Sequence, residues 1–221
     1  MPMTSTLTRP AAHSVGSNLR EAGDLDLMTR LGARTSFARD DEIYGQEEAA
    51  DLIYQVVTGA VRTSHLMADG RRQIGDFYYQ GDVFGTEPGQ DHVFSAEALS
   101  DAVVLVVKRS TVRDDGAGRL ESLLGEAARR ELKRAHEHVL MLGRKTACEK
   151  VASLLMNIAD RSEYDCVELP MGRQDMADYL GLTIETVSRM LTQLQVSSVV
   201  EFASLRSFQV KNRQALARLT H

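Results

Sequence analysis

The spacing of hydrophobic and polar residues changes along the chain, and each spacing predicts a different kind of element. From Arg34 to about Val112, short alternating runs separated by turn residues predict many β-strands. From Gly118 to Gly143, apolar residues recur at steps of three and four, as in one long helix. Beyond Gly143 we expect a second helix over 147–159, a short strand, two paired helices, a two-stranded wing and a closing helix.

The strand-rich segment is typical of a β-roll or jelly-roll barrel. Asp69 and Gly70 separate two alternating runs, and this dipeptide strongly predicts a hairpin turn. Gly59, Gly81 and Gly85 also interrupt the runs. Many short strands at such regular spacing close most readily into a barrel or roll.

The long helix carries an apolar stripe that fits a coiled-coil seam. The stripe consists of Leu120, Leu124, Ala128, Leu132, Ala135, Val139 and Leu142. The charged residues lie mostly off this stripe. A helix packed in its own core has similar spacing, but a helix between two domains has little remaining chain to cover it. We therefore expect the stripe to join two copies of the chain, with Gly143 as a candidate hinge.

The segment 173–194 predicts two helices joined by a tight turn. Gly181 ends the first helix, where a positive φ is usually required, and Thr183 can cap the second helix. Ala177 provides the small side chain that two crossing helices need. An inward stripe supports the pair: Met176, Leu180, Leu182, Val187, Met190, Leu191 and Leu194.

Polar residues at the start of the second helix can recognise base edges in the major groove. Arg189 can donate two hydrogen bonds to guanine, Glu185 can accept one from cytosine, and Ser188 is short and adaptable. Ile184 can contact a thymine methyl group. The predicted DNA-binding set is completed by the flanking residues Thr183, Thr186 and Arg173. The alternative is a helical hairpin with a solvated charged face.

We expect the chain to consist of four segments. These are a disordered tail at 1–20, a β-roll at 21–117, a dimerisation helix at 118–143 and a winged helix-turn-helix at 144–221. The net charge is −5. Residues 144–221 hold 10 Lys and Arg against 9 Asp and Glu, whereas 1–143 hold 16 against 22. The acidity therefore lies away from the helices that would approach phosphates.

The chain has no apolar run that predicts secretion or a membrane span. Residues 1–18 are small and polar, and a short helix is predicted over Asn18–Met28. The two cysteines, Cys148 and Cys166, fit a reducing compartment without a structural disulfide. We therefore expect a cytoplasmic protein with no membrane partner. Cys166 precedes the helix pair and is a candidate redox residue.

This α+β order of roll, long helix and winged helix resembles the CRP/FNR superfamily of bacterial transcription regulators. The resemblance covers nearly the whole chain after about residue 20 and is sharpest in GDVFG at 81–85 and LGLTIETVSRMLTQL at 180–194. The second block resembles the FNR and FixK branch, in which a Glu-x-x-Ser-Arg face reads a palindrome with TTGA-like half-sites.

The resemblance implies a homodimeric activator, of the FixK type, that controls genes for low-oxygen respiration or nitrogen fixation. Its partners would be double-stranded DNA, a second copy of the chain and RNA polymerase. Glu185, Ser188 and Arg189 would read bases. Arg71 and Arg72 follow the turn whose counterpart contacts the polymerase, although a solvated charged turn explains them equally well.

The chain departs from both sensor chemistries of this superfamily. Cyclic-nucleotide binding resembles a Gly-Glu pair followed by Arg-Ser, but here Thr86 follows Gly85 and Phe94 precedes Ser95. An apolar ring cannot neutralise a buried phosphate. The iron–sulfur branch uses N-terminal cysteines, and none precedes Cys148. We therefore expect no cofactor and an effector-independent regulator; the alternative is a roll that binds an unidentified small molecule.

The histidines do not predict a metal site or an enzyme. His65 and His92 lie in the predicted roll, where a metal enzyme would need several histidines and a carboxylate, and the roll contains no His-x-His pair. His136 and His138 lie two residues apart on the long helix and point in different directions. A metal-dependent roll enzyme would lack its ligands, and a pure interaction protein would leave the base-reading face unexplained.

Overall fold

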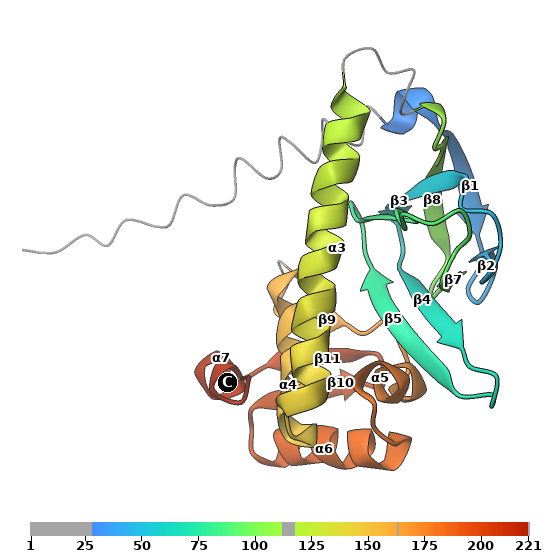
Figure 1. The fold of residues 1–221 in the computed structure, drawn as a ribbon. Coiled ribbons are helices and arrows are strands. Elements are labelled where there is room, and N and C mark those ends of the chain that lie inside the picture. The colour runs from blue at the N-terminus through green and yellow to red at the C-terminus, as the bar shows by residue number, and fades with distance from the viewer. Residues whose placement is uncertain (1–27, 112–117, 163, 221) are drawn as a thin grey trace, which may run out of the picture.

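Figure 1 shows the computed structural model of the protein, which describes residues 28–111, 118–162 and 164–220. A β-roll lies beside the upper part of one long helix, and the winged helix-turn-helix surrounds the lower part of that helix (Figure 1). The predicted tail at 1–20 lies outside the described residues, as does the predicted helix Asn18–Met28 except for its last residue. The predicted α+β architecture is confirmed.

In the described part of the roll, eight strands form two antiparallel four-stranded sheets. Their orders are β1-β8-β3-β6 and β2-β7-β4-β5. The strands are β1 (Ala33–Phe37), β2 (Glu42–Tyr44), β3 (Leu52–Thr58), β4 (Val61–Leu66), β5 (Arg72–Tyr78), β6 (Val83–Phe84), β7 (Ser95–Ala98) and β8 (Ala102–Lys108). The predicted hairpin joins β4 to β5, and Gly70 has a φ of 85° there.

Aromatic rings fill one core of the roll. The rings of Tyr54 and Phe84 are 5.1 Å apart, and the ring of Tyr44 stacks on that of His92 at 3.7 Å. These four side chains are buried. Gly85, with a φ of 74°, follows β6 directly, and a Cβ there would lie 2.8 Å from the Tyr54 ring. The close approach of backbone and ring therefore requires glycine at this position.

The long helix α3 (Arg119–Arg144) follows the predicted range closely. Gly143 does not break the long helix, contrary to the expectation of a break there. Gly143 lies inside the last turn, because the amide of Lys145 still donates to the carbonyl of Met141. A single glycine costs a helix only about 1 kcal/mol, so Gly143 does not by itself end α3. The chain becomes extended at Lys145.

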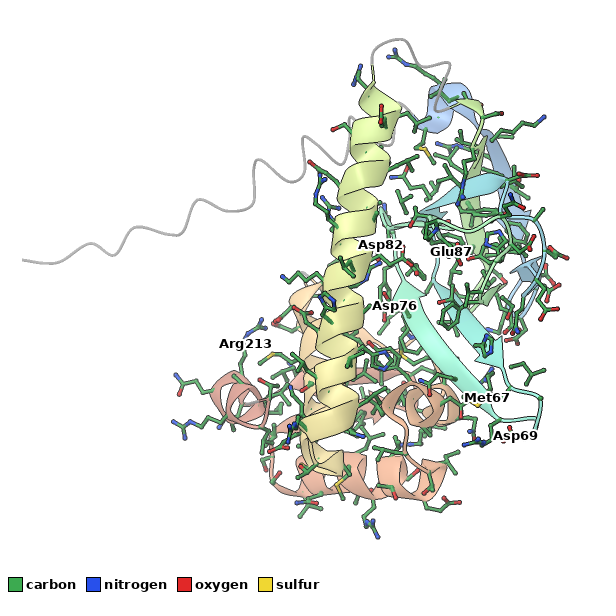
Figure 2. All side chains as sticks on the ribbon, in the orientation of Figure 1. Met67, Asp69, Asp76, Asp82, Glu87 and Arg213 are labelled. Carbon is green, nitrogen blue, oxygen red and sulfur yellow. The ribbon has the colours of Figure 1, made fainter. Side chains whose placement is uncertain are left out.

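Charged pairs hold α3 against the roll. Arg134 of α3 contacts the carboxylate of Asp76 with a 2.6 Å distance between Nε and Oδ2. Its Nη1 lies 3.7 Å from Asp82, which also pairs with Arg161 at 2.8 Å. Figure 2 shows Asp76 and Asp82 on the side of the roll that faces this helix. These contacts join the roll, α3 and the following helix.

The C-terminal part is a winged helix, as predicted. Its elements are α4 (Ala147–Asp160), β9 (Cys166–Glu168), α5 (Arg173–Leu180), α6 (Ile184–Val196), β10 (Val200–Ser204), β11 (Ser207–Val210) and α7 (Arg213–Arg218). The predicted wing strands pair as β10 and β11, and β9 adds a third strand to their sheet. Thr146 and Glu149 form a capping box at the start of α4.

One apolar core spans the roll and the winged helix. Ile74 and Phe77 of β5 belong to the same buried cluster as Leu155, Leu180 and Leu191 of the three helices α4 to α6. In Figure 1, β5 lies beside α5 at the junction of the two parts. The position of the winged helix is therefore tied to the roll by packing as well as by the chain connection.

Candidate nucleic-acid interface

The helix pair α5 and α6 has the geometry that the sequence predicts. Gly181 has a φ of 61°, and its amide donates to the carbonyl of Ala177 at the end of α5. Ala177 is only 1% exposed, as expected where the two helices approach closely. In the predicted stripe, Met176, Leu180, Val187, Leu191 and Leu194 are buried, and Leu182 and Met190 pack against the same core.

Thr183 caps α6 and also holds the first acidic side chain of the helix. Its hydroxyl accepts a hydrogen bond from the amide of Thr186 at 3.3 Å. The side chain of Glu185 is fully exposed, and its pKa is lowered by its own backbone amide and by a hydrogen bond from the Thr183 hydroxyl. Glu185 is therefore ionised at neutral pH and can only accept hydrogen bonds.

The remaining predicted reading residues share one face of α6. Glu185, Ser188 and Arg189 lie at helical spacing of three and four residues, with Ile184 beside them. Ile184 is 38% exposed, Arg189 is exposed, and Ser188 and Thr186 are half-buried. Within the described part of the chain, Arg189 forms no hydrogen bond or ion pair. The guanidinium is therefore free to bind an external acceptor.

This face lies at the edge of the molecule. Helix α6 is at the opposite end from the roll, with no described element beyond it (Figure 1). Arg173 is the first residue of α5 and is half-buried, and its Nε has no hydrogen-bond partner among the described residues. The wing turn between β10 and β11 carries Leu205, which is 74% exposed. A helix presented in this way can enter a groove of about 12 Å width.

The predicted dimerisation stripe divides into covered and open positions. Leu120 differs from the expectation, because it is fully buried against the roll of its own chain, and Leu124 packs on the same cluster. At the other end Leu142 is half-buried. The open positions between them are Ala128, Leu132, Ala135 and Val139. Leu132 and Val139 are 58% and 67% exposed, which leaves an uncovered apolar strip on α3.

Glu131 of α3 occupies hydrogen-bond donors of the roll. The hydroxyl of Thr86 donates to its Oε2 at 2.5 Å, and the hydroxyl of Tyr78 donates to its Oε1 at 3.3 Å. Arg109 donates to the carbonyl of Gly85 at 2.9 Å. The carboxylate of Glu131 therefore binds the hydroxyl donors of Thr86 and Tyr78, which face α3 from the roll.

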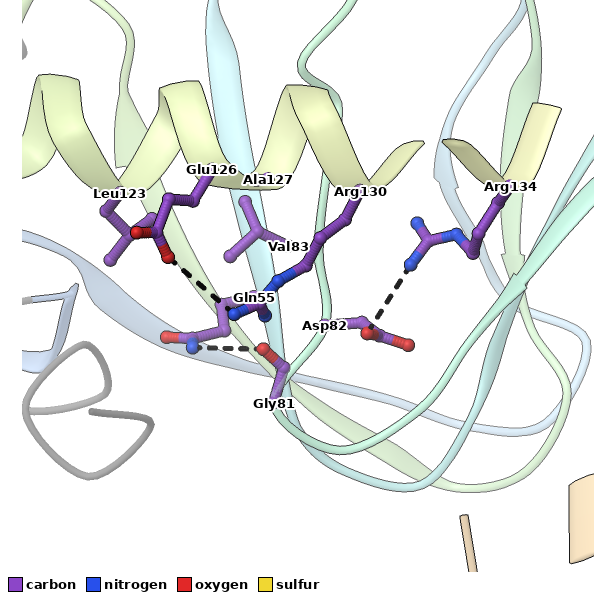
Figure 3. A pocket seen from close by; sticks show the side chains of 9 residues that line it. All are labelled: Gln55, Gly81, Asp82, Val83, Leu123, Glu126, Ala127, Arg130 and Arg134. Atoms are coloured by element: carbon purple, nitrogen blue, oxygen red, sulfur yellow. Dashed lines mark hydrogen bonds and ion pairs between the residues drawn. The ribbon is translucent and has the colours of Figure 1, made fainter. Parts of the chain in front are cut away.

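The residues present do not fit a cyclic nucleotide. Phe94 packs over Gly75, where an added Cβ would lie 2.8 Å from its ring, so it fills space and offers no charge. The donors Thr86 and Tyr78 already bind Glu131, and a second anion beside that carboxylate would be repelled. The small cavity at Gly81 in Figure 3, about 20 Å³, has room for about one water, whereas a wider cleft of about 510 Å³ lies beside Thr86 and Arg109.

The two arginines after the hairpin have different surroundings. Arg71 is 76% exposed and pairs with Asp69 of its own turn at 2.8 Å. Arg72 differs from the expectation of a free surface residue, because its guanidinium binds Asp175 and Asp178 of α5, each at 2.8 Å. Burial against α5 leaves only 26% of its side chain exposed.

The other candidate residues are placed as follows. Cys166 is exposed at the start of β9, and Cys148 is half-buried, with a pKa raised by burial. The Nδ1 of His65 donates to the backbone carbonyl oxygen of Val93 at 2.8 Å. Among the described residues no three His, Cys, Asp or Glu side chains form a group that could hold a metal.

No helix in the described ranges has the length and apolarity needed to cross a membrane.

Residues that contact across the molecule were not anticipated from the sequence. They include Glu131, which binds Thr86, and the pair formed by Arg62 and Asp175. Asp175 lies three residues after Gly172 and accepts its amide, so its capping position was a readable local signal. The long-range partners carried no such signal.

Comparison with known proteins agrees with this architecture. Residues 149–219 match the Crp-like helix-turn-helix domain, and residues 34–114 match the cyclic nucleotide-binding domain. The nitrogen fixation regulation protein FixK of Azorhizobium caulinodans is 43% identical over 226 residues, covering 99% of this chain and 91% of the relative. FixK of Rhizobium meliloti is 40% identical over 179 residues, covering 80% and 82%.

Solved structures show the same fold. FixK2 from Bradyrhizobium japonicum superposes with a TM-score of 0.82 and 44% identity, covering 86% of this chain and 98% of that one. The CRP-family regulator TTHB099 from Thermus thermophilus has a TM-score of 0.71 and 25% identity, with coverage of 84% and 96%. The helix-turn-helix, the roll and this similarity along nearly the whole chain together show that the protein is a DNA-binding transcription regulator and belongs to the CRP/FNR family.

Proposed function

We propose that this regulator is a homodimeric activator that binds a palindrome of TTGA-like and TCAA-like half-sites without an effector. The observation that carries the proposal is the open face of α6, on which Glu185, Ser188 and Arg189 are exposed or half-buried at the edge of the molecule. Arg189 can donate to guanine and Glu185 can accept from cytosine, which fits the base pairs of such half-sites. Thr183, Thr186, Ile184 and Arg173 complete the interface.

The uncovered strip on α3 supports a dimer. An apolar strip that includes Leu132 and Val139 is costly in water and is removed when two copies of α3 pair in a coiled coil. Two-fold symmetry would then place two α6 helices on half-sites about 34–36 Å apart, which is one turn of DNA. The proposed seam runs from Leu124 to Leu142, with Ala128, Leu132, Ala135 and Val139 at its centre.

Effector independence is supported by the contacts of Glu131. Its carboxylate joins α3 to Thr86 and Tyr78 without any added molecule. The rings of Tyr44, Tyr54 and Phe84 pack together in one buried core of the roll. The roll and α3 are therefore joined at this point by side chains of the protein alone.

The regulated genes are inferred from relatives. Two of them are named nitrogen fixation regulation proteins, so we propose genes of nitrogen fixation or of low-oxygen respiration as targets. Activation requires RNA polymerase, and the exposed Arg71 beside the hairpin turn is our candidate contact. These proposed partners support the cytoplasm as the location of the protein.

Selection of bound duplexes from a random library, with purified protein and nothing added, tests the proposal. Enrichment of one palindrome with half-sites about one turn apart is expected. Enrichment of a single asymmetric site would contradict the dimer, and the absence of any enriched sequence would contradict unaided recognition.

A second function is favoured by one observation. A cleft of about 510 Å³ lies between the roll and the start of α3, lined by Ile53, Leu124 and Ala128 with Arg109 and Glu121 at polar positions. A small molecule bound there would make the protein ligand-controlled. Thermal melting across a panel of metabolites tests this, because a ligand of the native state raises the melting temperature. Leu124 and Ala128 also lie on the proposed seam, so a partner helix would approach this cleft.

A further inference from the structure

We propose that an ion cluster between the roll and α5 positions the reading helix α6 and thereby sets the half-site spacing that the dimer accepts. The cluster consists of Arg62, Arg72, Glu97, Asp175 and Asp178, and is called the roll–α5 cluster below. Arg62, Arg72 and Glu97 belong to strands β4, β5 and β7 of one sheet, and the two aspartates belong to α5. This inference rests on the proposed dimer.

The contacts of the roll–α5 cluster are short and shared. Arg62 Nη1 lies 3.0 Å from Asp175 Oδ1, and Arg72 Nη2 lies 2.8 Å from the same oxygen. Arg72 Nε also donates to Asp178 Oδ2 at 2.9 Å. On its other side Arg62 donates through Nε to Glu97 Oε2 at 2.9 Å. Both guanidinium groups therefore make contacts in two directions, which fixes their planes.

Asp175 connects the roll to the first turn of α5. Its second carboxylate oxygen, Oδ2, accepts the amide of Gly172 at 3.0 Å. One side chain thus caps the helix with one oxygen and binds two arginines of the roll with the other. A rotation of α5 relative to β4 and β5 would break these contacts together.

Burial makes such a rotation unfavourable. The side chains of Arg62 and Asp175 are 12% and 9% exposed, so water cannot readily replace a lost partner. Separating a buried ion pair leaves an uncompensated charge, which is strongly unfavourable. Apolar contact between the rings of Phe77 and Tyr179, 5.1 Å apart, also holds the junction, but hydrophobic contact is not directional. Between the roll and α5 the directional restraint comes from the ions, whereas His138 Nε2, 2.7 Å from the carbonyl oxygen of Tyr179, holds α5 to α3.

The restraint on α5 reaches α6 through a short rigid connection. Gly181 in its left-handed conformation and the Thr183 cap join the two helices, and Leu180 and Val187 are fully buried between them. The orientation of the reading face relative to the roll and α3 therefore follows that of α5. In a dimer, the same restraint in both subunits sets the separation and rotation of the two reading faces.

DNA spacing reports this restraint directly. One added base pair moves a half-site by about 3.4 Å and rotates it by about 34°, because about 10.5 base pairs make one turn of 34–36 Å. A dimer with fixed reading helices rejects such a site. A dimer whose helices can swivel accepts it more readily, while each helix still reads its own bases.

The test measures binding of the full chain to the selected palindrome and to versions with the spacer changed by one base pair in either direction. The variants are Arg62→Gln with Arg72→Gln, and separately Asp178→Asn, which leaves the Asp175 cap in place. Arg34→Gln, which changes an exposed arginine of β1, is the matched control. Circular dichroism melting verifies that each variant is folded.

We expect the wild type and Arg34→Gln to lose affinity on the altered spacers, and the cluster variants to reduce that loss by on the order of tenfold, the scale on which residues of a coupling network act. The preference of the variants for the correct half-site sequence over a scrambled one stays unchanged. If both folded variants keep the wild-type spacing profile, the positioning role is refuted and the proposed function stands. If the wild type selects no palindrome, the proposed function itself has failed.

Discussion

Leu132→Ala tests whether the open strip on α3 joins two copies of the chain. The side chain of Leu132 is 58% exposed in the single chain. Full burial of a leucine side chain contributes about 1.5–3 kcal/mol, so the exposed share corresponds to about 1–2 kcal/mol per subunit. Two subunits lose this contribution together. Allowing for the methyl group that alanine retains, the dimer is weakened by about 1.5–3 kcal/mol.

This change corresponds to a dimer dissociation constant about 10- to 150-fold higher. Sedimentation equilibrium over a range of protein concentrations measures it. Leu140→Ala is the matched control, because Leu140 is 64% exposed on the same helix but lies off the stripe. We expect Leu140→Ala to leave the dissociation constant nearly unchanged. Equal weakening by both substitutions, or a wild type that sediments as a monomer, would refute the seam.

Four further predictions concern recognition, backbone, pH and oxidation. Arg189→Ala costs roughly 1–3 kcal/mol at the selected site and relaxes reading at the guanine; an equal loss on random DNA in a binding titration would show a phosphate contact instead. Gly181→Ala, at a φ of 61°, lowers the free energy of unfolding by about 1–2 kcal/mol. Gly143→Ala, where an added Cβ meets open space within α3, raises it by up to about 1 kcal/mol. Thermal melting compares the two variants, and equal effects would contradict the backbone argument. Burial lowers the pKa of His138, so the unfolded state binds the proton more readily and the free energy of unfolding falls as the pH drops below about 6.5. Denaturant titrations at pH 7 and pH 5 are expected to show a smaller fall for His138→Gln than for the wild type. An equal fall in both proteins would reject the assignment. Peroxide lowers DNA affinity in the wild type and less in Cys166→Ser, and equal sensitivity would remove Cys166 as a redox residue.

Local signals made the helix-turn-helix predictable from the sequence. The turn needs a positive φ at Gly181, the second helix needs a cap at Thr183, and both requirements coincide with an apolar stripe of helical spacing. Each feature restricts the same few residues, so they reinforce one another. The long helix and the hairpin at Gly70 were predictable for the same reason.

Features that depend on distant contacts were not predictable. The spacing of Leu120 fits a seam and a core equally well, and only the folded roll shows which surface covers it. Arg72 looked like a surface residue of a turn because its partners lie more than 100 positions away in the chain. The carboxylate of Glu131 likewise meets Thr86 only after the helix has packed on the roll. Charge pairs of this kind leave no periodic trace in a sequence.

The apolar cluster that includes Ile74 and Phe77 along with residues of α4 to α6 has a consequence for folding cooperativity. Cutting the chain near residue 144 would remove the roll residues that pack in one cluster with Leu180 and Tyr179. The isolated C-terminal fragment would then expose apolar surface to solvent. Calorimetry of the intact chain is therefore expected to give one transition in place of two, and work on the DNA-reading part is best done on the entire polypeptide.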